Sequence, residues 1–170
     1  QAESPQAARA QEVVQSISDA HQRLRSVIRG LMPVDAIPEG LMEALEHLAR
    51  QCEAVSGISC RFECESPVHV EDPGTALHLF RIAQEAMNNA VRHAQPGQIT
   101  LCLVRRGQRL EIVVTDDGRG FGTFRAEHSG MGLASMRQRA RLLGGDCTVA
   151  SREGGGTTVV CWVPSRTVRA

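Results

Sequence analysis

The stretch RIAQEAMNNAVRHA, residues 81–94, combines a helical pattern with many hydrogen-bonding side chains. Glu85, Asn89 and His93 follow one another at intervals of four residues, and Arg92 lies about one turn from Asn89. A carboxylate and an amide one turn apart can hold a hydrated Mg²⁺ or orient a water molecule beside it. The alternative is a solvent-exposed helix face with an Arg–Glu ion pair, which the stretch alone favours because such faces are common.

A second candidate, TDDGRGFG, follows directly after a hydrophobic run that is typical of a strand. Asp116 or Asp117 therefore stands at the end of a strand, where ligands often bind. Gly118 and Gly120 permit positive φ angles and a close approach of the backbone to a flat ligand or a phosphate. An ordinary Asp-Gly turn is the alternative. Such turns usually connect hairpins, however, and no strand pattern follows here for many residues.

Two further glycine motifs complete the set of candidates. In HSGMGLASMRQRA, Gly130 and Gly132 precede a helical pattern, and N–H groups at a helix N-terminus bind anions such as phosphate. Taken alone, this pattern is equally typical of a turn. In GGGTTVV, Gly156 and Thr157 open a strand, which by itself predicts only a hairpin turn.

The surrounding sequence predicts the elements that must position these residues. Apolar periodicity predicts helices over 6–32, 39–56, 72–94 and 132–143. Alternation predicts strands over 58–64, 98–106, 109–116, 147–151 and 158–164. Short turns between neighbouring strands predict an α+β two-layer sandwich, a mixed and mostly antiparallel sheet with helices on one face and a long helix before it. Glu111 is expected on the polar face, opposite Leu110, Ile112 and Val114.

The first predicted helix differs from the rest because no partner for its apolar stripe lies within the same segment. Val13, Ile17, Leu24 and Leu31 belong to this stripe, which is typical of a coiled-coil or bundle contact. Pro33 and Pro38 then predict a hinge.

Composition narrows the chemistry. Of the 170 residues, 42% are hydrophobic, and 19 basic residues balance 19 acidic ones, so neither nucleic acid nor a membrane is an expected partner. All the basic residues are Arg, which excludes a P-loop lysine. The sequence shows no signal peptide and no apolar run that would span a bilayer. We therefore expect a soluble, cytoplasmic chain, compatible with being the cytoplasmic part of a membrane-anchored sensor.

The six cysteines lie at positions 52, 60, 64, 102, 147 and 161 without a C-x-x-C pair. Most fall in strand-like runs, which favours buried free thiols over a zinc site or a disulfide framework. Free thiols would suit a reducing cytoplasm.

In this order, the four motifs resemble the N, G1 and G2 boxes and the closing Gly-Thr of the GHKL ATP-binding fold, the Bergerat fold of gyrase, chaperone ATPases and histidine kinases. The finer pattern resembles the catalytic domain of sensor histidine kinases of the nitrate-sensor and DesK-like subfamily. The segment LRSVIRGLMPVDAIPEGLMEAL resembles the end of that family's second dimerisation helix and its link to the ATPase domain. The resemblance covers roughly residues 20–164. It implies a dimerisation-helix segment and hinge over 1–33 and an ATP-binding domain over 34–170.

At the base end of the nucleotide, the resemblance implies that Asp116 accepts the adenine amino N–H and that Thr157 lies beside it. Gly118 and Gly120 would let the backbone approach the nucleotide. At the phosphate end, it implies that Asn89 coordinates Mg²⁺ and that Glu85 assists as a base or orients water.

For the remaining positions, the resemblance places Arg92 and His93 near the phosphates, where the family commonly has Lys-His. It implies that Gly130 and Gly132 offer N–H groups at the end of an ATP lid over about 122–129, and that Leu133 belongs to the same nucleotide site. Asp117 replaces an Asn found in many relatives.

The activity implied is that of a protein-histidine kinase with ATP and Mg²⁺ as cofactors. Such a domain transfers the γ-phosphoryl group to a His on the dimerisation domain of the same homodimeric parent, for relay to a response-regulator Asp. No acceptor-like His is found in this sequence, and His21 lies in an ordinary helical context. The alternatives are an anti-sigma-factor-type Ser kinase and a non-catalytic nucleotide-sensing module. An upstream helix with a His followed by an acidic residue would favour the histidine kinase.

Overall fold

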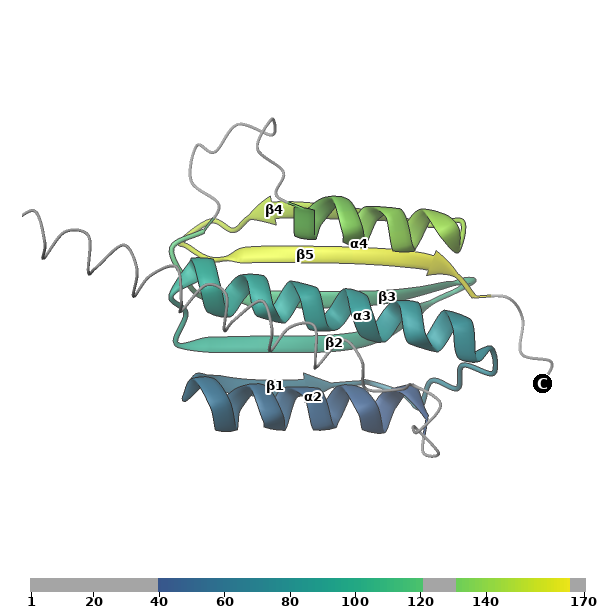
Figure 1. Ribbon diagram of the computed structural model, residues 1–170, viewed down its shortest axis with the longest axis horizontal. Coiled ribbons are helices and arrows are strands. Elements are labelled where there is room, and N and C mark those ends of the chain that lie inside the picture. The colour runs from purple at the N-terminus through teal and green to yellow at the C-terminus, as the bar shows by residue number, and fades with distance from the viewer. Residues whose placement is uncertain (1–39, 121–130, 166–170) are drawn as a thin grey trace, which may run out of the picture. The chain divides into compact units, whose positions relative to one another are not determined.

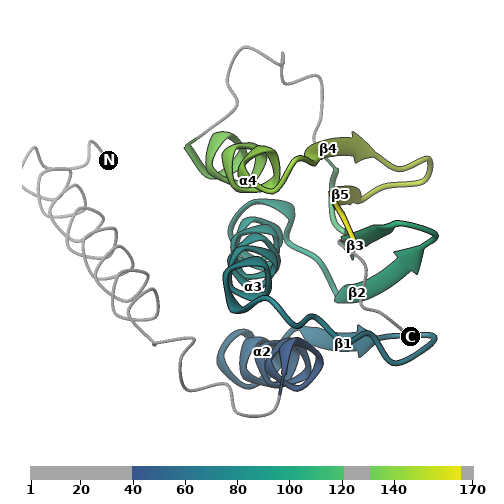
Figure 2. The same cartoon turned by 90° about the vertical axis from the view of Figure 1, so that its right-hand side faces the viewer.

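The computed structural model describes residues 40–120 and 131–165, which belong to a compact unit spanning Ile37–Ala170. Three helices form one layer and five strands form the other (Figure 2). The helix predicted over 6–32, the hinge and the proposed lid lie outside the described residues. No helix among the described residues combines the length and the apolar character needed to cross a membrane.

The sheet contains β1 (Ser59–Glu63), β2 (Gln98–Arg106), β3 (Arg109–Asp116), β4 (Asp146–Ser151) and β5 (Thr157–Pro164). Its strand order is β1-β2-β3-β5-β4 (Figure 1). Only the β1–β2 pair is parallel, and the other three pairs are antiparallel. The prediction of a mixed, mostly antiparallel sheet is confirmed.

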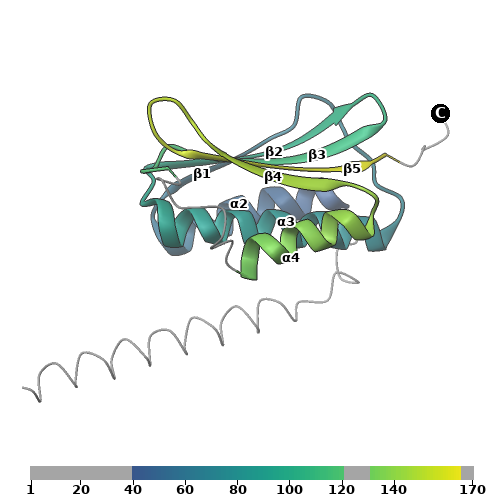
Figure 3. The same ribbon diagram turned by 90° about the horizontal axis from the view of Figure 1, so that it is seen from above.

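The helices α2 (Leu41–Ser56), α3 (Pro73–Asn89) and α4 (Met131–Leu142) all cover the same face of this sheet (Figure 3). In α2, the buried residues Leu41, Leu45 and Leu48 follow the helical repeat, and Gly57 ends the helix with a φ of 72°. Asp72 caps α3 by accepting a hydrogen bond from the Thr75 N–H at 2.7 Å. These termini agree with the sequence prediction to within a few residues.

The hydrophobic core lies between the two layers. The sheet contributes alternate residues, among them Ile99, Leu101, Leu103, Ile112 and Val163. The helices contribute the buried faces of α2, α3 and α4. As predicted, Glu111 lies on the opposite face of the sheet, where it forms an ion pair of 3.3 Å with Arg106. The buried face of α3 includes Leu79, Ile82 and Ala86.

The prediction that all six cysteines are free was wrong for two of them. Cys147 and Cys161 are direct cross-strand partners on β4 and β5, with Cα atoms 4.0 Å apart, and they form a disulfide. The antiparallel register brings these two thiols together, and this register cannot be read from the spacing of cysteines along the sequence. The other four cysteines are free, and burial raises the pKa of the Cys60 thiol to about 12.

Candidate functional site

Asp116 is the last residue of β3 and is only 5% exposed. Its Oδ1 accepts hydrogen bonds from the backbone N–H of Gly118 at 2.9 Å and of Thr157 at 3.2 Å. Thr157 is in reach because β3 and β5 are neighbouring antiparallel strands. Both bonds go to the same oxygen, so the carboxylate has a fixed orientation and its Oδ2 remains for a donor on a ligand.

Close packing of backbone segments surrounds this carboxylate. A Cβ at Gly118 would collide with the carbonyl oxygen of Ala94, and one at Gly156 with the carbonyl oxygen of Asp116. Gly156 also has a φ of +90°, which side chains rarely adopt. The turns after β3 and before β5 therefore form one wall beside Asp116, and these segments can pack so closely only because both positions are glycine.

A second cluster lies where α4 begins against α3. A Cβ placed at Gly132 would collide with Oε1 of Glu85 and would lie 3.2 Å from Nδ2 of Asn89. The first turn of α4 thus meets a carboxylate and an amide that lie four residues apart on α3. Free N–H groups at the start of a helix favour anions, and amide and carboxylate oxygens are ligands that Mg²⁺ accepts. The set of donors therefore fits a magnesium phosphate.

The helix carrying these side chains does not end in a regular α-helical turn. Residues Ala90–Ala94 form a π-helical turn, η2, which contains the exposed Arg92 and His93. Gln95 follows with a φ of 51° and is the only non-glycine residue with a positive φ among those described. A π turn shifts the register of the side chains that follow, and such turns are frequent at functional sites.

Asp117, for which the sequence suggested no role, links the loop after β3 to the residues at the start of β2. Its Oδ1 accepts hydrogen bonds from the N–H groups of Gly97 and Gln98, both at 2.8 Å. These bonds, that from Gln98 foremost, lower the pKa of the Asp117 carboxyl. The exposed side chain of Asp117 therefore connects the end of β3 to the start of β2.

Three further sequence-predicted residues lie elsewhere than in these two clusters or outside the described residues. Gly120 lies against the Gly156 carbonyl, with its Cβ position 3.1 Å from that oxygen. Leu133 is 9% exposed and belongs to the hydrophobic core. Gly130 lies outside the described residues. Among the described residues, no three acidic, His or Cys side chains gather as a metal-binding group. A Mg²⁺ held largely by phosphates and water needs no such group.

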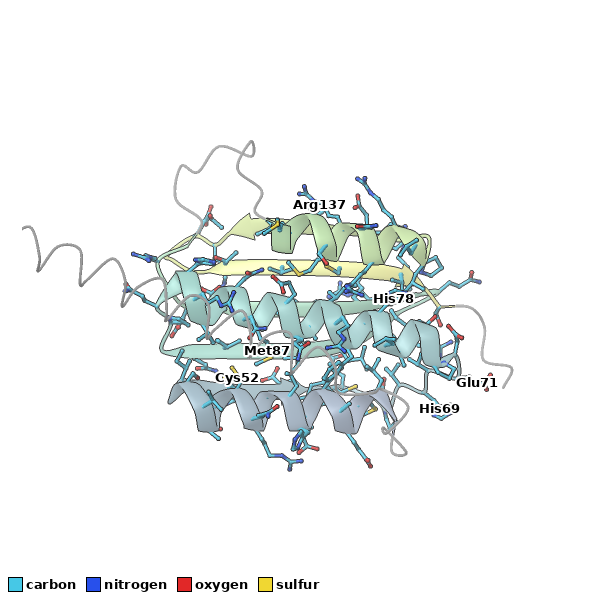
Figure 4. The ribbon with its side chains drawn as sticks, viewed as in Figure 1. Cys52, His69, Glu71, His78, Met87 and Arg137 are labelled. Atoms are coloured by element: carbon cyan, nitrogen blue, oxygen red, sulfur yellow. A yellow bond between two sulfur atoms is a disulfide. The ribbon has the colours of Figure 1, made fainter. Side chains whose placement is uncertain are left out.

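Two arginines at this site were not predicted from the sequence. Arg119 donates from Nε to the carbonyl of His93 at 3.0 Å, and Arg152 donates from Nη1 to the carbonyl of Asp116 at 3.4 Å. Arg119 lies within the DGRG motif and Arg152 lies just before the glycine run. Their closeness to these two motifs is the only feature of the sequence that could have indicated a role at the site. A third arginine, Arg137 of α4 (Figure 4), donates from Nε to the Cys147 carbonyl at 3.2 Å and fastens α4 to β4.

Comparison with known proteins identifies the fold and the family. The family described as "Histidine kinase-, DNA gyrase B-, and HSP90-like ATPase" matches residues 74–167, more than half of the chain. The chain belongs to this ATPase family. The matched range contains the Asp116 wall and the Glu85–Asn89–Gly132 cluster. The resemblance drawn from the four sequence motifs is thereby confirmed.

Curated relatives of this ATPase domain are sensor histidine kinases. The chain is 33% identical to the sensor histidine kinase LiaS of Bacillus subtilis over 86% of its own length and 40% of that protein. It is 34% identical to the nitrate/nitrite sensor protein NarX of Escherichia coli over 75% of its length and 22% of NarX. The chain therefore spans less than half the length of these relatives.

Solved structures show the same fold. The histidine kinase domain of the blue-light activated kinase EL346 from Erythrobacter litoralis superposes with a TM-score of 0.60 at 25% identity, covering 74% of this chain and 61% of that one. The ATP binding domain of PrrB from Mycobacterium tuberculosis gives a TM-score of 0.59 at 21% identity, covering 75% of this chain and 96% of that domain. The latter shows similarity of fold alone.

Proposed function

We propose that this chain is the ATP-binding catalytic domain of a sensor histidine kinase. It would transfer the γ-phosphoryl group of ATP to a His on a dimerisation domain, for relay to a response-regulator Asp. The observation that carries the proposal is the Asp116 carboxylate, held by Gly118 and Thr157 with one oxygen left for a ligand. An adenine amino group is a donor that this oxygen can accept. The sensor-kinase identity of the matched relatives supports the histidine as acceptor.

The residues at the other end of the proposed site would handle the phosphates. Asn89 would hold Mg²⁺ through its amide oxygen, and the N–H groups of the first turn of α4 would hold phosphate oxygens. Glu85 lies against Gly132 and would orient the acceptor or a water molecule. When bound, Mg²⁺ would neutralise charge on the phosphates. Arg92 would add positive charge and His93 a hydrogen-bonding ring near the phosphates, since both lie in the turn that follows Asn89.

The test is a calorimetric titration of ATP, with and without Mg²⁺, into the wild type and Asp116→Asn. Asn keeps an acceptor for the N–H groups of Gly118 and Thr157, but it replaces the free oxygen with an NH₂ donor. This donor would face the donor of adenine, and we expect ATP affinity to fall roughly tenfold to hundredfold. GTP would be affected less, since guanine offers an acceptor at the corresponding position. Equal ATP affinity of the two proteins would contradict the assignment of Asp116.

Phosphotransfer needs a second experiment. With labelled ATP and a separately supplied dimerisation domain of a related sensor kinase, we expect acid-labile phosphate on that domain. Glu85→Gln is the matched variant, because it keeps the shape of the side chain and removes its charge. Transfer to a Ser, which yields acid-stable phosphate, would favour the Ser-kinase alternative instead.

A further inference from the structure

The segment Asp117–Arg119 contacts the C-terminal end of the helix that carries Glu85 and Asn89. The backbone N–H of Arg119 donates to the Ala94 carbonyl at 2.9 Å, and its side-chain Nε donates to the His93 carbonyl at 3.0 Å. Gly118 packs directly against the same Ala94 carbonyl. One loop therefore binds two successive carbonyl groups of η2.

These hydrogen bonds satisfy backbone carbonyl groups that have no partner within the helix. The last carbonyl groups of a helix have no partner within it, and they attract cationic donors because the C-terminal end of a helix is negative. Here the donors come from the loop after β3, far away in sequence, instead of from the residues that follow the helix. The conformation of η2 is thereby coupled to the loop that forms the Asp116 wall.

We propose that Arg119 is a positioning residue for the phosphate end of the nucleotide site. Its Nε–H bond to His93 holds the π turn in which Arg92 and His93 lie, and it thereby fixes the backbone from which these two side chains extend. This inference rests on the proposed function, which assigns Arg92 and His93 to the phosphates. Arg119 acts through the backbone of η2 and does not itself contact the nucleotide.

A pair of substitutions separates the hydrogen bond from the charge. In Arg119→Gln, the amide Nε2 lies as many bonds from Cα as the Nε of arginine, so the donor is kept and the charge is lost. Arg119→Met has a side chain of similar length without a donor. Since Arg119 is exposed, neither change leaves a cavity. Arg119→Ala repeats the Met comparison with the side chain removed.

The measurements are ATP and AMP affinity by calorimetry and amide hydrogen exchange of residues 90–95. We expect Arg119→Met to weaken ATP binding roughly three- to tenfold, about the net effect of one hydrogen bond, and to leave AMP affinity within about twofold. Exchange in η2 should become faster in the same variant. Arg119→Gln should behave like the wild type in all three measurements.

The outcomes that would overturn the proposal are distinct from failure of the proposed function. If Arg119→Gln loses as much ATP affinity as Arg119→Met, the charge acts directly on the phosphates and the positioning role is wrong. Unchanged hydrogen exchange in Arg119→Met would also refute it. A wild type that binds no ATP would refute the proposed function. Faster exchange in Arg119→Met alone would then still establish the coupling of Arg119 to η2.

Discussion

At the scale of single residues, the glycines of the site differ in what an added Cβ would meet. At Gly118 it would meet backbone, the carbonyl of Ala94, which also accepts a hydrogen bond from the Arg119 N–H. At Gly132 it would meet the end of the flexible Glu85 side chain, which can turn aside. An added Cβ at Gly118 should therefore destabilise the fold, whereas one at Gly132 should only displace the Glu85 carboxylate.

We therefore predict opposite effects for two Gly→Ala substitutions. Gly118→Ala should lower the free energy of unfolding by roughly 1–3 kcal/mol through overpacking. Gly132→Ala should leave stability equal or raise it by about 0.5–1 kcal/mol, because Ala favours helix, while weakening Mg²⁺-ATP binding several-fold. Denaturant unfolding and calorimetry measure the two effects.

The control for this pair is Gly74→Ala in the first turn of α3. The nearest atom to its Cβ position is Oδ2 of Asp72, in ordinary contact at 3.4 Å. Gly74→Ala should change the free energy of unfolding by no more than about 1 kcal/mol, and it should leave ATP affinity unchanged. If Gly132→Ala binds ATP as the wild type does, the displacement of Glu85 is irrelevant to binding.

Asp117 gives a prediction for the dependence of stability on pH. Its pKa in the folded protein is lowered from 3.8 by the bonds from Gln98 and Gly97. The stabilisation is therefore present above the unfolded pKa and is lost as pH falls through the folded value. In Asp117→Asn, stability should fall less steeply below about pH 4, as measured by denaturant unfolding at several pH values. Glu71→Gln, at an exposed residue, is the control and should keep the wild-type slope. A slope for Asp117→Asn equal to that of the wild type would contradict the prediction.

The role of a residue could be predicted from the sequence where its partners lie close to it along the chain. The spacing of Glu85 and Asn89 already placed both on adjacent turns of one helix, and the structure brings Gly132 against them. Arg119 escaped prediction because its partner, His93, is 26 residues away and contributes a backbone carbonyl. A backbone acceptor carries no mark in the sequence, so such a contact appears only when the chain is folded.

At the scale of elements, the helices and strands followed from periodicity, but the pairing between strands did not. The sequence predicted β4 and β5 as a hairpin without its register. In the structure, this register places Cys147 opposite Cys161 on neighbouring strands, beneath α4. The π turn at the end of α3 was likewise invisible, since the sequence continues a helical pattern to Ala94.

The disulfide gives a prediction for the β4–β5 hairpin. In denaturant without reductant, thiol titration should detect four of the six cysteines, and all six after reduction. Reduction, or the double change Cys147→Ala and Cys161→Ala, should lower the free energy of unfolding by about 2–3 kcal/mol for a loop of this length. Cys52→Ala, on a free cysteine, is the control for thiol number. Six titratable thiols in the unreduced protein would contradict the pairing.

At the scale of the whole molecule, the core formed by the described residues belongs to one compact unit. All its members lie between Leu41 and Val163, within the compact unit Ile37–Ala170. The chain also spans only 40% of LiaS and 22% of NarX, so the relatives join such a domain to other parts. Under the proposed function, the acceptor histidine would lie in another part of such a protein.

We therefore predict that residues 37–170 fold and bind ATP without residues 1–36. Because the described core lies entirely within this unit, we expect the midpoint of thermal unfolding to change by no more than about 4 °C, the shift expected for less than 1 kcal/mol. ATP affinity should be unchanged. The sequence also predicts an apolar helical stripe over residues 13–31, so the full chain should self-associate with rising concentration while the shorter one stays monomeric. Sedimentation velocity separates the two cases. An unfolded or non-binding 37–170 chain would show that the first 36 residues complete the domain.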